Sequence, residues 1–209
     1  MSHTGADRRR LLIATGSRHK FEELSALLDL PSTELLSLSD VGLTDSAVEN
    51  GQTFEANARI KALHYSALSG LPTLADDSGL EVDALGGRPG IYTRRFAGPD
   101  ATDEQNNAKL LAELDGFYGP DERTARYRCV LLLVDGDGAE EITTGSLEGR
   151  IADSSRGGGG FGYDPIFEPL TELAGSRTVG QMSASEKNAI SHRAQAARAM
   201  RDRLLARGY

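Results

Sequence analysis

The stretch "ARYRCVLLLVDGDGAEEITTGSLEGRIA", residues 125–152, consists of two strand-like runs joined by Asp135-Gly136-Asp137-Gly138. A cluster of Asp and Gly between two such runs is typical of a tight turn, so the stretch predicts a β-hairpin. Two strands joined by a hairpin are antiparallel. At least one part of the sheet is therefore expected to be antiparallel.

Before the hairpin, short apolar strands alternate with helical patterns. Leucines at positions 24, 27 and 28 follow Phe21 at helical spacing, between two apolar runs. Alternating strands and helices favour parallel pairing, and the hairpin adds antiparallel pairing. We therefore predict an α/β fold with a mixed central sheet flanked by helices. The expected strands are 11–15, 33–40 and 71–76, and the expected helices are 16–30, 53–69, 104–116 and 183–208.

Helix boundaries carry their own signals. Ser17 is an expected N-cap, Gly70 an expected stop, and Ser183 with Glu186 matches a capping box. Thr102 or Asp103 is expected to begin the third helix.

Composition limits the function classes. The 209 residues predict a single domain over 11–209, with residues 1–10 as a flexible tail. The net charge of -8 argues against duplex nucleic acid as a partner, although a few local cations can still hold a triphosphate. Cys129 is alone, which excludes an internal disulfide and fits a reducing, cytoplasmic location. No apolar run is long enough for a membrane span.

The first motif is "ATGSRHK", residues 14–20, where an expected strand turns into a helix. Backbone N–H groups at a helix N-terminus attract phosphate, and Lys20 could add a point charge. The alternative is an N-cap serine beside a solvated lysine. The motif is not a P-loop.

Carboxylates form the second group of candidates. Asp76 ends the expected strand 71–76 and Asp77 follows it, at the end of a strand where ligands bind in α/β sheets. Oxygen ligands suit Mg²⁺ or Mn²⁺. The alternative is an exposed turn. Glu49 precedes the helix 53–69, in which Lys61 lies on one face with Asn57.

The third group lies near the end of the chain. The glycine-rich loop "GGGGFGYDPIF" contains Phe161 and Tyr163, which could stack on a base, and Asp164, which could accept a hydrogen bond. In the last helix, Lys187 lies five and six positions before His192 and Arg193. These three share no face of an unbroken helix, so they could converge only at its N-terminus or if it breaks near Ser191.

Five blocks together resemble the inosine/xanthosine triphosphate pyrophosphatase family: "ATGSRHKFEEL", "ENGQTFEANARIKA", "ADDSGLEVDALGGRPGIYTRRFAG", "GFGYDPIF" and "MSASEKNAISHRAQA". The resemblance covers nearly the whole chain. It implies two lobes with an active-site cleft between them, usually in a homodimer. It also implies Mg²⁺-dependent hydrolysis of ITP, dITP and XTP to the monophosphate and pyrophosphate, which cleans the nucleotide pool of deaminated purines.

The resemblance also implies roles for single residues. Glu49 and Asp77 would hold Mg²⁺, and Asp77 would accept a proton; Asp76 is expected to support Asp77. The family usually has Asn where this chain has Ser17, which has a shorter reach toward phosphate. The implied substrate-binding residues are Thr15, Gly16, Ser17, Arg18, His19, Lys20, Lys61, Ser78, Phe161, Gly162, Tyr163, Asp164, Lys187, His192 and Arg193.

Three alternatives to this function use the same groups. A phosphotransferase would pass phosphate to a second substrate, and a regulatory nucleotide-binding module would bind without turnover. A related hydrolase would act on modified pyrimidine nucleotides.

Overall fold

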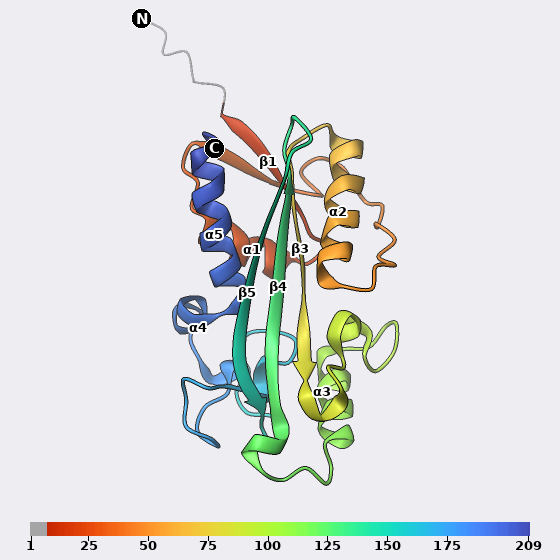
Figure 1. Cartoon of the computed structure of the whole chain (residues 1–209), viewed down its shortest axis with the longest axis vertical. Helices are drawn as coiled ribbons and strands as arrows, with labels where there is room; N and C mark the ends of the chain where they lie inside the picture. The colour runs from red at the N-terminus through yellow and green to blue at the C-terminus, as the bar shows by residue number, and fades with distance from the viewer. Residues whose placement is uncertain (1–7) are drawn as a thin grey trace, which may run out of the picture. The chain divides into compact units, whose positions relative to one another are not determined.

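The computed structural model describes residues 8–209 and contains a six-stranded sheet of order β2-β1-β3-β4-β5-β6 (Figure 1). β1 is parallel to both β2 and β3, whereas β5 and β6 are antiparallel. This pairing confirms the predicted mixed α/β sheet. The strands are β1 Arg9–Ala14, β2 Thr33–Ser37, β3 Thr73–Val82, β4 Thr124–Val134, β5 Glu140–Ile151 and β6 Phe167–Pro169; the helices are α1 Arg18–Leu28, α2 Phe54–Ser69, α3 Asp103–Glu113, α4 Ala184–Ile190 and α5 His192–Ala206.

The chain divides into two compact units whose boundaries fall inside β3, β4 and β5. Among the described residues, unit 1 contains 8–77, 130–144 and 196–209; unit 2 contains 78–129 and 145–195. The single domain expected for 11–209 stays a prediction.

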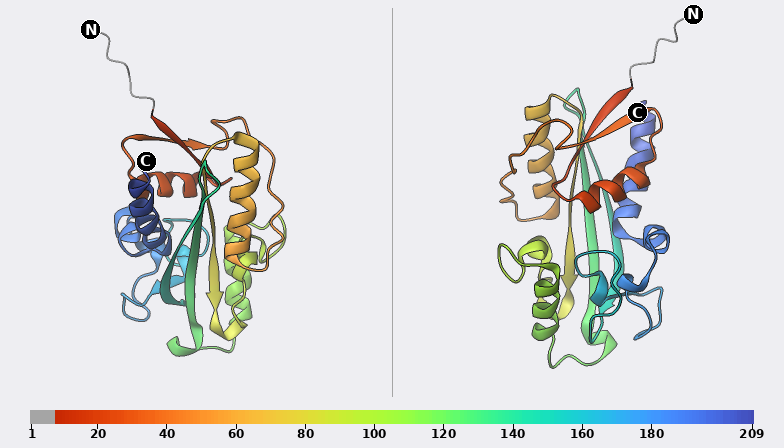
Figure 2. Two further views of the ribbon diagram at one scale, coloured as in Figure 1. Left: turned by 45° about the horizontal axis from the view of Figure 1, so that its top comes forward. Right: turned by 180° about the vertical axis from the view of Figure 1, so that it is seen from behind.

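In unit 1, α2 covers one face of the strands, and α1 and α5 cover the other (Figures 1 and 2). Each strand presents side chains to both faces of the sheet, because successive side chains point to opposite sides. On the α2 side, the buried core includes Leu12, Ala58, Ala62, Ala75 and Leu132. This packing fixes where α1 and α2 present their polar residues to β3.

The helix caps of unit 1 follow the sequence signals. The Ser17 side chain accepts from the backbone N–H of Lys20 and begins α1. Thr53 caps α2 in the same way, and Gly70 ends it in the left-handed conformation that glycine adopts at low cost. These three boundaries confirm the predicted ones.

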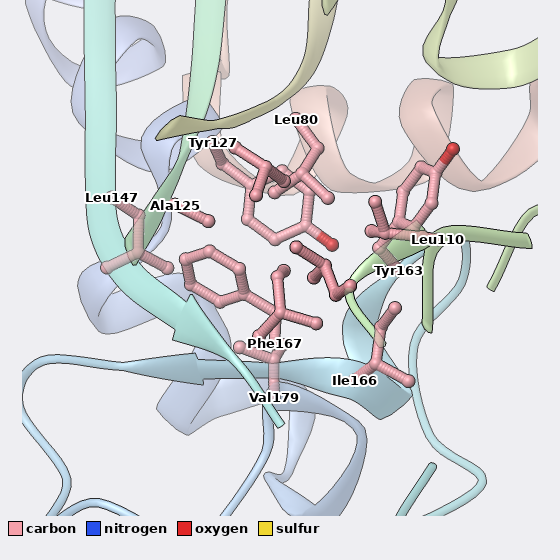
Figure 3. Close-up of a cluster of buried hydrophobic side chains, with 12 residues drawn as sticks. Leu80, Leu110, Ala125, Tyr127, Leu147, Tyr163, Ile166, Phe167 and Val179 are labelled. Atoms are coloured by element: carbon pink, nitrogen blue, oxygen red, sulfur yellow. The ribbon is translucent and has the colours of Figure 1, made fainter. Parts of the chain in front are cut away.

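Unit 2 has its own core, in which α3 packs against β3, β4 and β6 (Figure 3). Leu80, Leu110, Tyr127, Ile166 and Phe167 are its central residues. Thr102 and Gln105 form a capping box at the start of α3. Because Ile166 and Phe167 end the glycine-rich loop, this loop leads directly into the core of unit 2.

Several boundaries differ from those expected. β1 begins at Arg9, inside the segment predicted as a tail, while residues 1–7 of that segment lie outside the described residues. β3 does not end at residue 76 but runs on to Val82. β6 falls in a segment for which we expected only a loop; it is three residues long and ends at Pro169, so it carries little periodic signal.

The predicted helix 183–208 is wrong as a single element. It is two helices separated by Ser191, whose ψ of 152° is extended. The Ser191 hydroxyl accepts from the backbone N–H of Ala194 at 3.2 Å, which satisfies a donor at the start of α5. The predicted capping box of Ser183 and Glu186 is confirmed at the start of α4.

Within residues 8–209, no helix combines the length and the apolar character needed to cross a membrane. Cys129 is buried in β4, as expected.

Candidate active site

Asp76 and Asp77 lie in the middle of β3 and are both buried, so the exposed-turn alternative is wrong. Neighbouring residues of a strand point to opposite faces. Lys20 of α1 lies 3.0 Å from Asp76, and Lys61 of α2 lies 2.8 Å from Asp77. Each carboxylate thus has its own lysine, supplied by the helix on its side of the sheet. This pairing allows two adjacent acids inside a strand, where an unpaired charge would be very costly.

Lys61 also contacts Glu49 at 2.9 Å, so one ammonium group joins Glu49 to Asp77. Burial alone would lower the pKa of Lys61, but Asp77, Asp76 and Glu49 together raise it. Burial raises the pKa of Asp77, and the nearby Lys61 and Lys20 offset this only in part. A carboxyl group with a raised pKa is a better proton acceptor near neutral pH.

The carboxylates of Glu49 and Asp77 both contact the Lys61 ammonium, so the two acids lie close to one another around a single positive charge. Mg²⁺ is usually held in proteins by one or two carboxylates together with water and substrate phosphates. Among residues 8–209, no group of three or more His, Cys, Asp or Glu side chains could hold a metal alone. The residues present therefore fit Mg²⁺ only as a partial site that a triphosphate would complete.

Asn57 fixes the segment that precedes α2. It is buried, and its side-chain oxygen accepts from the backbone N–H of Gly51 at 2.8 Å. A side chain at Gly51 would collide with Asn57 and Ala56. Because Gly51 follows Glu49 by two residues, this contact helps to hold Glu49 in place. Sequence reasoning placed Asn57 beside Lys61 but gave it no such role.

The turn from β1 into α1 presents the predicted phosphate-binding segment. Ser17 donates its backbone N–H to the Thr15 hydroxyl at 3.2 Å, and its own hydroxyl accepts from the backbone of Lys20 at 3.4 Å. Gly16 and His19 are exposed, and Arg18 is exposed and paired with Glu22. From this segment, Lys20 reaches a carboxylate of β3, that of Asp76, at 3.0 Å.

Unit 2 contains a second polar centre, around Asp164. Its Oδ2 accepts from Lys187 Nζ at 2.8 Å and from the backbone N–H of Phe161 at 3.0 Å. The Lys187 ammonium also lies 4.3 Å from the centre of the Phe161 ring. A side chain at Gly160 would collide with Asp164, which explains a glycine there. The glycine-rich loop is thus a constrained turn rather than a flexible surface loop.

The break at Ser191 brings the remaining predicted residues to the same centre. Arg193 is 2 % exposed, donates to the Ser78 hydroxyl at 3.0 Å and lies 5.7 Å from the Phe161 ring centre. Lys187 and Arg193 therefore approach one ring, although no face of an unbroken helix could present both.

Phe161 and Tyr163 have different environments. Tyr163 is buried in the core of unit 2 and donates its hydroxyl to the backbone oxygen of Thr93 at 2.8 Å. Phe161 is half-buried. The predicted stacking role therefore suits Phe161, and Tyr163 supports the loop from inside.

Two residues of α3 hold the same loop, although the sequence named the first only as a possible start of the helix and the second not at all. Asp103 accepts from the backbone N–H of Gly162 at 2.6 Å, and Asn107 donates to the Gly162 oxygen at 3.1 Å. From the sequence, only their location at the start of an expected helix could be predicted.

The mixed sheet, the lysine-paired carboxylates and the Asp164 centre define an α/β protein with a buried polar centre in each of its two units. Residues 11–203 match the Ham1 family, and the chain belongs to that family. A protein of Thioalkalivibrio sulfidiphilus named dITP/XTP pyrophosphatase is 48% identical over 95% of this chain and 100% of its own length. One of the same name from Geobacter sulfurreducens is 47% identical over 93% of this chain and 96% of its own length. The solved Ham1 protein of Staphylococcus aureus is 34% identical, with a TM-score of 0.84 over 95% of this chain and 100% of that one.

Proposed function

We propose that this protein hydrolyses ITP, dITP and XTP to the nucleoside monophosphate and pyrophosphate. The observation that carries the proposal is family membership over nearly the whole chain, shared with relatives named dITP/XTP pyrophosphatase. The lysine-paired carboxylates of unit 1 give that membership a chemical basis. Removal of deaminated purines from the nucleotide pool is the corresponding biological role.

Asp77 is the proposed proton acceptor. It takes a proton from the water that attacks the α-phosphorus, while the bond to the bridging oxygen breaks and pyrophosphate leaves. Lys61 keeps the Asp77 carboxylate oriented through their 2.8 Å contact. Lys20 and Lys61 supply positive charge for the oxygens of the departing group. Residues 15–20 offer the N–H groups of the α1 N-terminus to the phosphates.

Glu49 and Asp77 would hold Mg²⁺. When bound, this ion supplies charge neutralisation for the phosphates and lowers the pKa of a coordinated water. A partial site of two carboxylates supports Mg²⁺ over a metal that prefers His or Cys ligands.

The Asp164 centre is proposed to recognise the base. Phe161 offers a ring for stacking, and Lys187, His192 and Arg193 offer N–H donors. Hypoxanthine and xanthine carry the acceptor O6, where adenine carries an amino group. A buried donor left without an acceptor costs about 1–3 kcal/mol, which corresponds to about five- to 150-fold discrimination against ATP. Guanine also carries O6, so this contact separates adenine from the other purines only.

The remaining expectations rest on the family resemblance. They are the homodimer, the cytoplasmic location, and the cleft between two lobes, and they stay predictions.

The proposed function is tested by measuring pyrophosphate release from ITP, XTP, dITP, GTP, ATP and dUTP, with Mg²⁺ and with EDTA. We expect Mg²⁺-dependent release that is fastest with ITP, dITP and XTP. Phosphate transfer to a second substrate, or tight ITP binding without turnover, would contradict the proposal. Preference for dUTP would instead assign the protein to pyrimidine nucleotides.

Arg193 tests the proposed base recognition separately. Arg193→Ala and the milder Arg193→Lys should both lower the ratio of kcat/KM for ITP to that for ATP. An unchanged ratio in both folded variants would remove Arg193 from base recognition.

A further inference from the structure

Tyr127 of β4 contacts both halves of the polar centre in unit 2, although nothing in the sequence singled it out. Its hydroxyl lies 3.2 Å from Asp164 Oδ1, and its ring is stacked on the imidazole of His192. The side chain is buried between the strand and the loop and also packs against Phe167 (Figure 3). One side chain thus reaches two groups that lie 28 residues apart (192 − 164) in the chain.

The hydroxyl contact acts on Lys187 through Asp164. Asp164 uses Oδ2 for the Lys187 ammonium and for the backbone of Phe161, and Oδ1 for Tyr127. Three donors on two oxygens fix both the position and the rotation of the carboxylate. Burial and the Asp164 charge raise the pKa of Tyr127 well above its usual value, so its hydroxyl stays a donor at any physiological pH. Lys187 is therefore anchored to a carboxylate that cannot turn away.

The ring contact acts on His192 directly. The Tyr127 and His192 ring centres are 4.7 Å apart, and the ring planes differ by 8°. Such stacked contacts contribute beyond the apolar area they bury, and they restrict the imidazole to one plane. His192 is the first residue of α5, where the chain has just turned at Ser191. The stack thus sets the direction in which its ring nitrogens point.

We propose that Tyr127 is a positioning residue for base recognition, which holds Lys187 through Asp164 and His192 by stacking. The proposal rests on the proposed function, because it assigns Tyr127 to the choice between bases rather than to the attack on phosphorus. Tyr127 has no role at Asp77, so its loss should affect recognition and leave the chemical step alone.

Two substitutions separate the contacts. Tyr127→Phe removes the hydroxyl bond and keeps the stack, while Tyr127→Leu removes both. In Tyr127→Phe we expect the ratio of kcat/KM for ITP to that for ATP to fall about two- to tenfold, the range for one hydrogen bond. KM for ITP should rise while kcat at saturating ITP stays within about twofold, because uniform binding is lost. Tyr127→Leu should lower the ratio by about a further two- to tenfold.

Tyr209→Phe is the matched control. Tyr209 is also a buried tyrosine that donates to a carboxylate, that of Asp135, but it lies in unit 1, and its ring contacts Arg9, which is not part of the proposed site. It should lose stability without any change in the ITP to ATP ratio. Equal ratios in Tyr127→Phe and Tyr209→Phe would overturn the positioning role, as would a fall in kcat without a change in KM.

The stack has a readout that needs no turnover. In NMR spectra with His192 assigned by a His192→Gln variant, the imidazole protons should be shifted upfield by the Tyr127 ring. Tyr127→Phe should keep that shift and Tyr127→Leu should lose it; an unchanged shift in Tyr127→Leu would contradict the stacking. If the wild type releases pyrophosphate from no triphosphate, the proposed function fails and the positioning role with it. If the wild type prefers ITP and Tyr127→Phe keeps the same ITP to ATP ratio, the positioning role fails alone.

Discussion

Lys61 is the residue whose removal tests the electrostatics of the site most directly. It is the shared partner of Asp77 and Glu49, so Lys61→Met leaves two carboxylates facing each other with a side chain of similar length and no charge. The Lys61 and Asp77 side chains are 11% and 12% exposed, whereas Glu49 is 35% exposed. The Asp77 contact therefore dominates the loss, and the Glu49 contact is largely screened by solvent.

The size of the effect follows from this burial. Removing one partner of a buried ion pair costs about 3–5 kcal/mol, because the other charge stays buried. At about 2–4 °C of Tm per kcal/mol for a chain of this length, Lys61→Met should melt about 6–20 °C below the wild type in EDTA. Mg²⁺ should raise the Tm of the variant more than that of the wild type. The reason is that the cation offsets the repulsion between Glu49 and Asp77, which Lys61 offsets in the wild type.

The assay is thermal unfolding followed by circular dichroism, with EDTA and with Mg²⁺. Lys109→Met is the control: Lys109 is 41% exposed and pairs with Glu113 at 3.6 Å within one helix. Such pairs contribute about 0.3–0.5 kcal/mol, so Tm should fall by no more than about 2 °C. If Lys61→Met melts like Lys109→Met, the buried bridge does not stabilise the fold. If Mg²⁺ raises the Tm of Lys61→Met no more than that of the wild type, the ion does not relieve the repulsion between Glu49 and Asp77.

Three further predictions concern single positions. Asp77→Asn should lower kcat by about 10²–10⁴, the usual contribution of a general base, yet lose less Tm than Lys61→Met, because the amide oxygen still accepts from Lys61; near-normal turnover would remove Asp77 from the proton-accepting role. For Asp135, burial alone raises the pKa, but the Tyr209 hydroxyl, the Gly136 N–H and Arg207 lower it overall. The Asp135 carboxylate therefore stabilises the fold above its usual pKa of 3.8, and this stabilisation is lost as the pH falls toward the lowered pKa. Between pH 5 and 2.5, Tm should fall less steeply in Asp135→Asn than in the wild type. Gly160→Ala places a methyl group against Asp164 at a residue with φ of 74°, so it should cost about 1–2 kcal/mol of stability and raise KM for ITP; an unchanged KM would show that Asp164 can move without loss.

The sequence predicted helix caps and tight turns well, because both depend on residues close together in the chain. Ser17 and Ser183 cap the helices they were expected to cap, because capping depends on a hydroxyl and a backbone N–H within a few residues. The signal for the hairpin, the Asp and Gly residues from Asp135 to Gly138, was equally local. Each motif block also carries its own chemistry, so the kinds of candidate group could be named from the sequence.

The long-range arrangement was not readable in the same way. The sequence left the place of Asp76 and Asp77 open between the end of a strand, where ligands bind, and an exposed turn. Only the positions of Lys20 and Lys61, 56 and 16 residues before the acids they pair with (76 − 20 and 77 − 61), make the longer strand possible. The break at Ser191 likewise depends on where α5 packs, and Tyr127 gains its contacts only when β4 meets the loop and α5.

The sequence alone determined the mixed α/β class, most helix boundaries and the identity of the candidate groups, because these depend on neighbours along the chain. Only the tertiary structure decided which cation meets which carboxylate, and that Lys187, His192 and Arg193 share one centre. The physical reason is that a buried charge is stable only beside its partner, and the partner is chosen by packing in three dimensions rather than by spacing in the sequence.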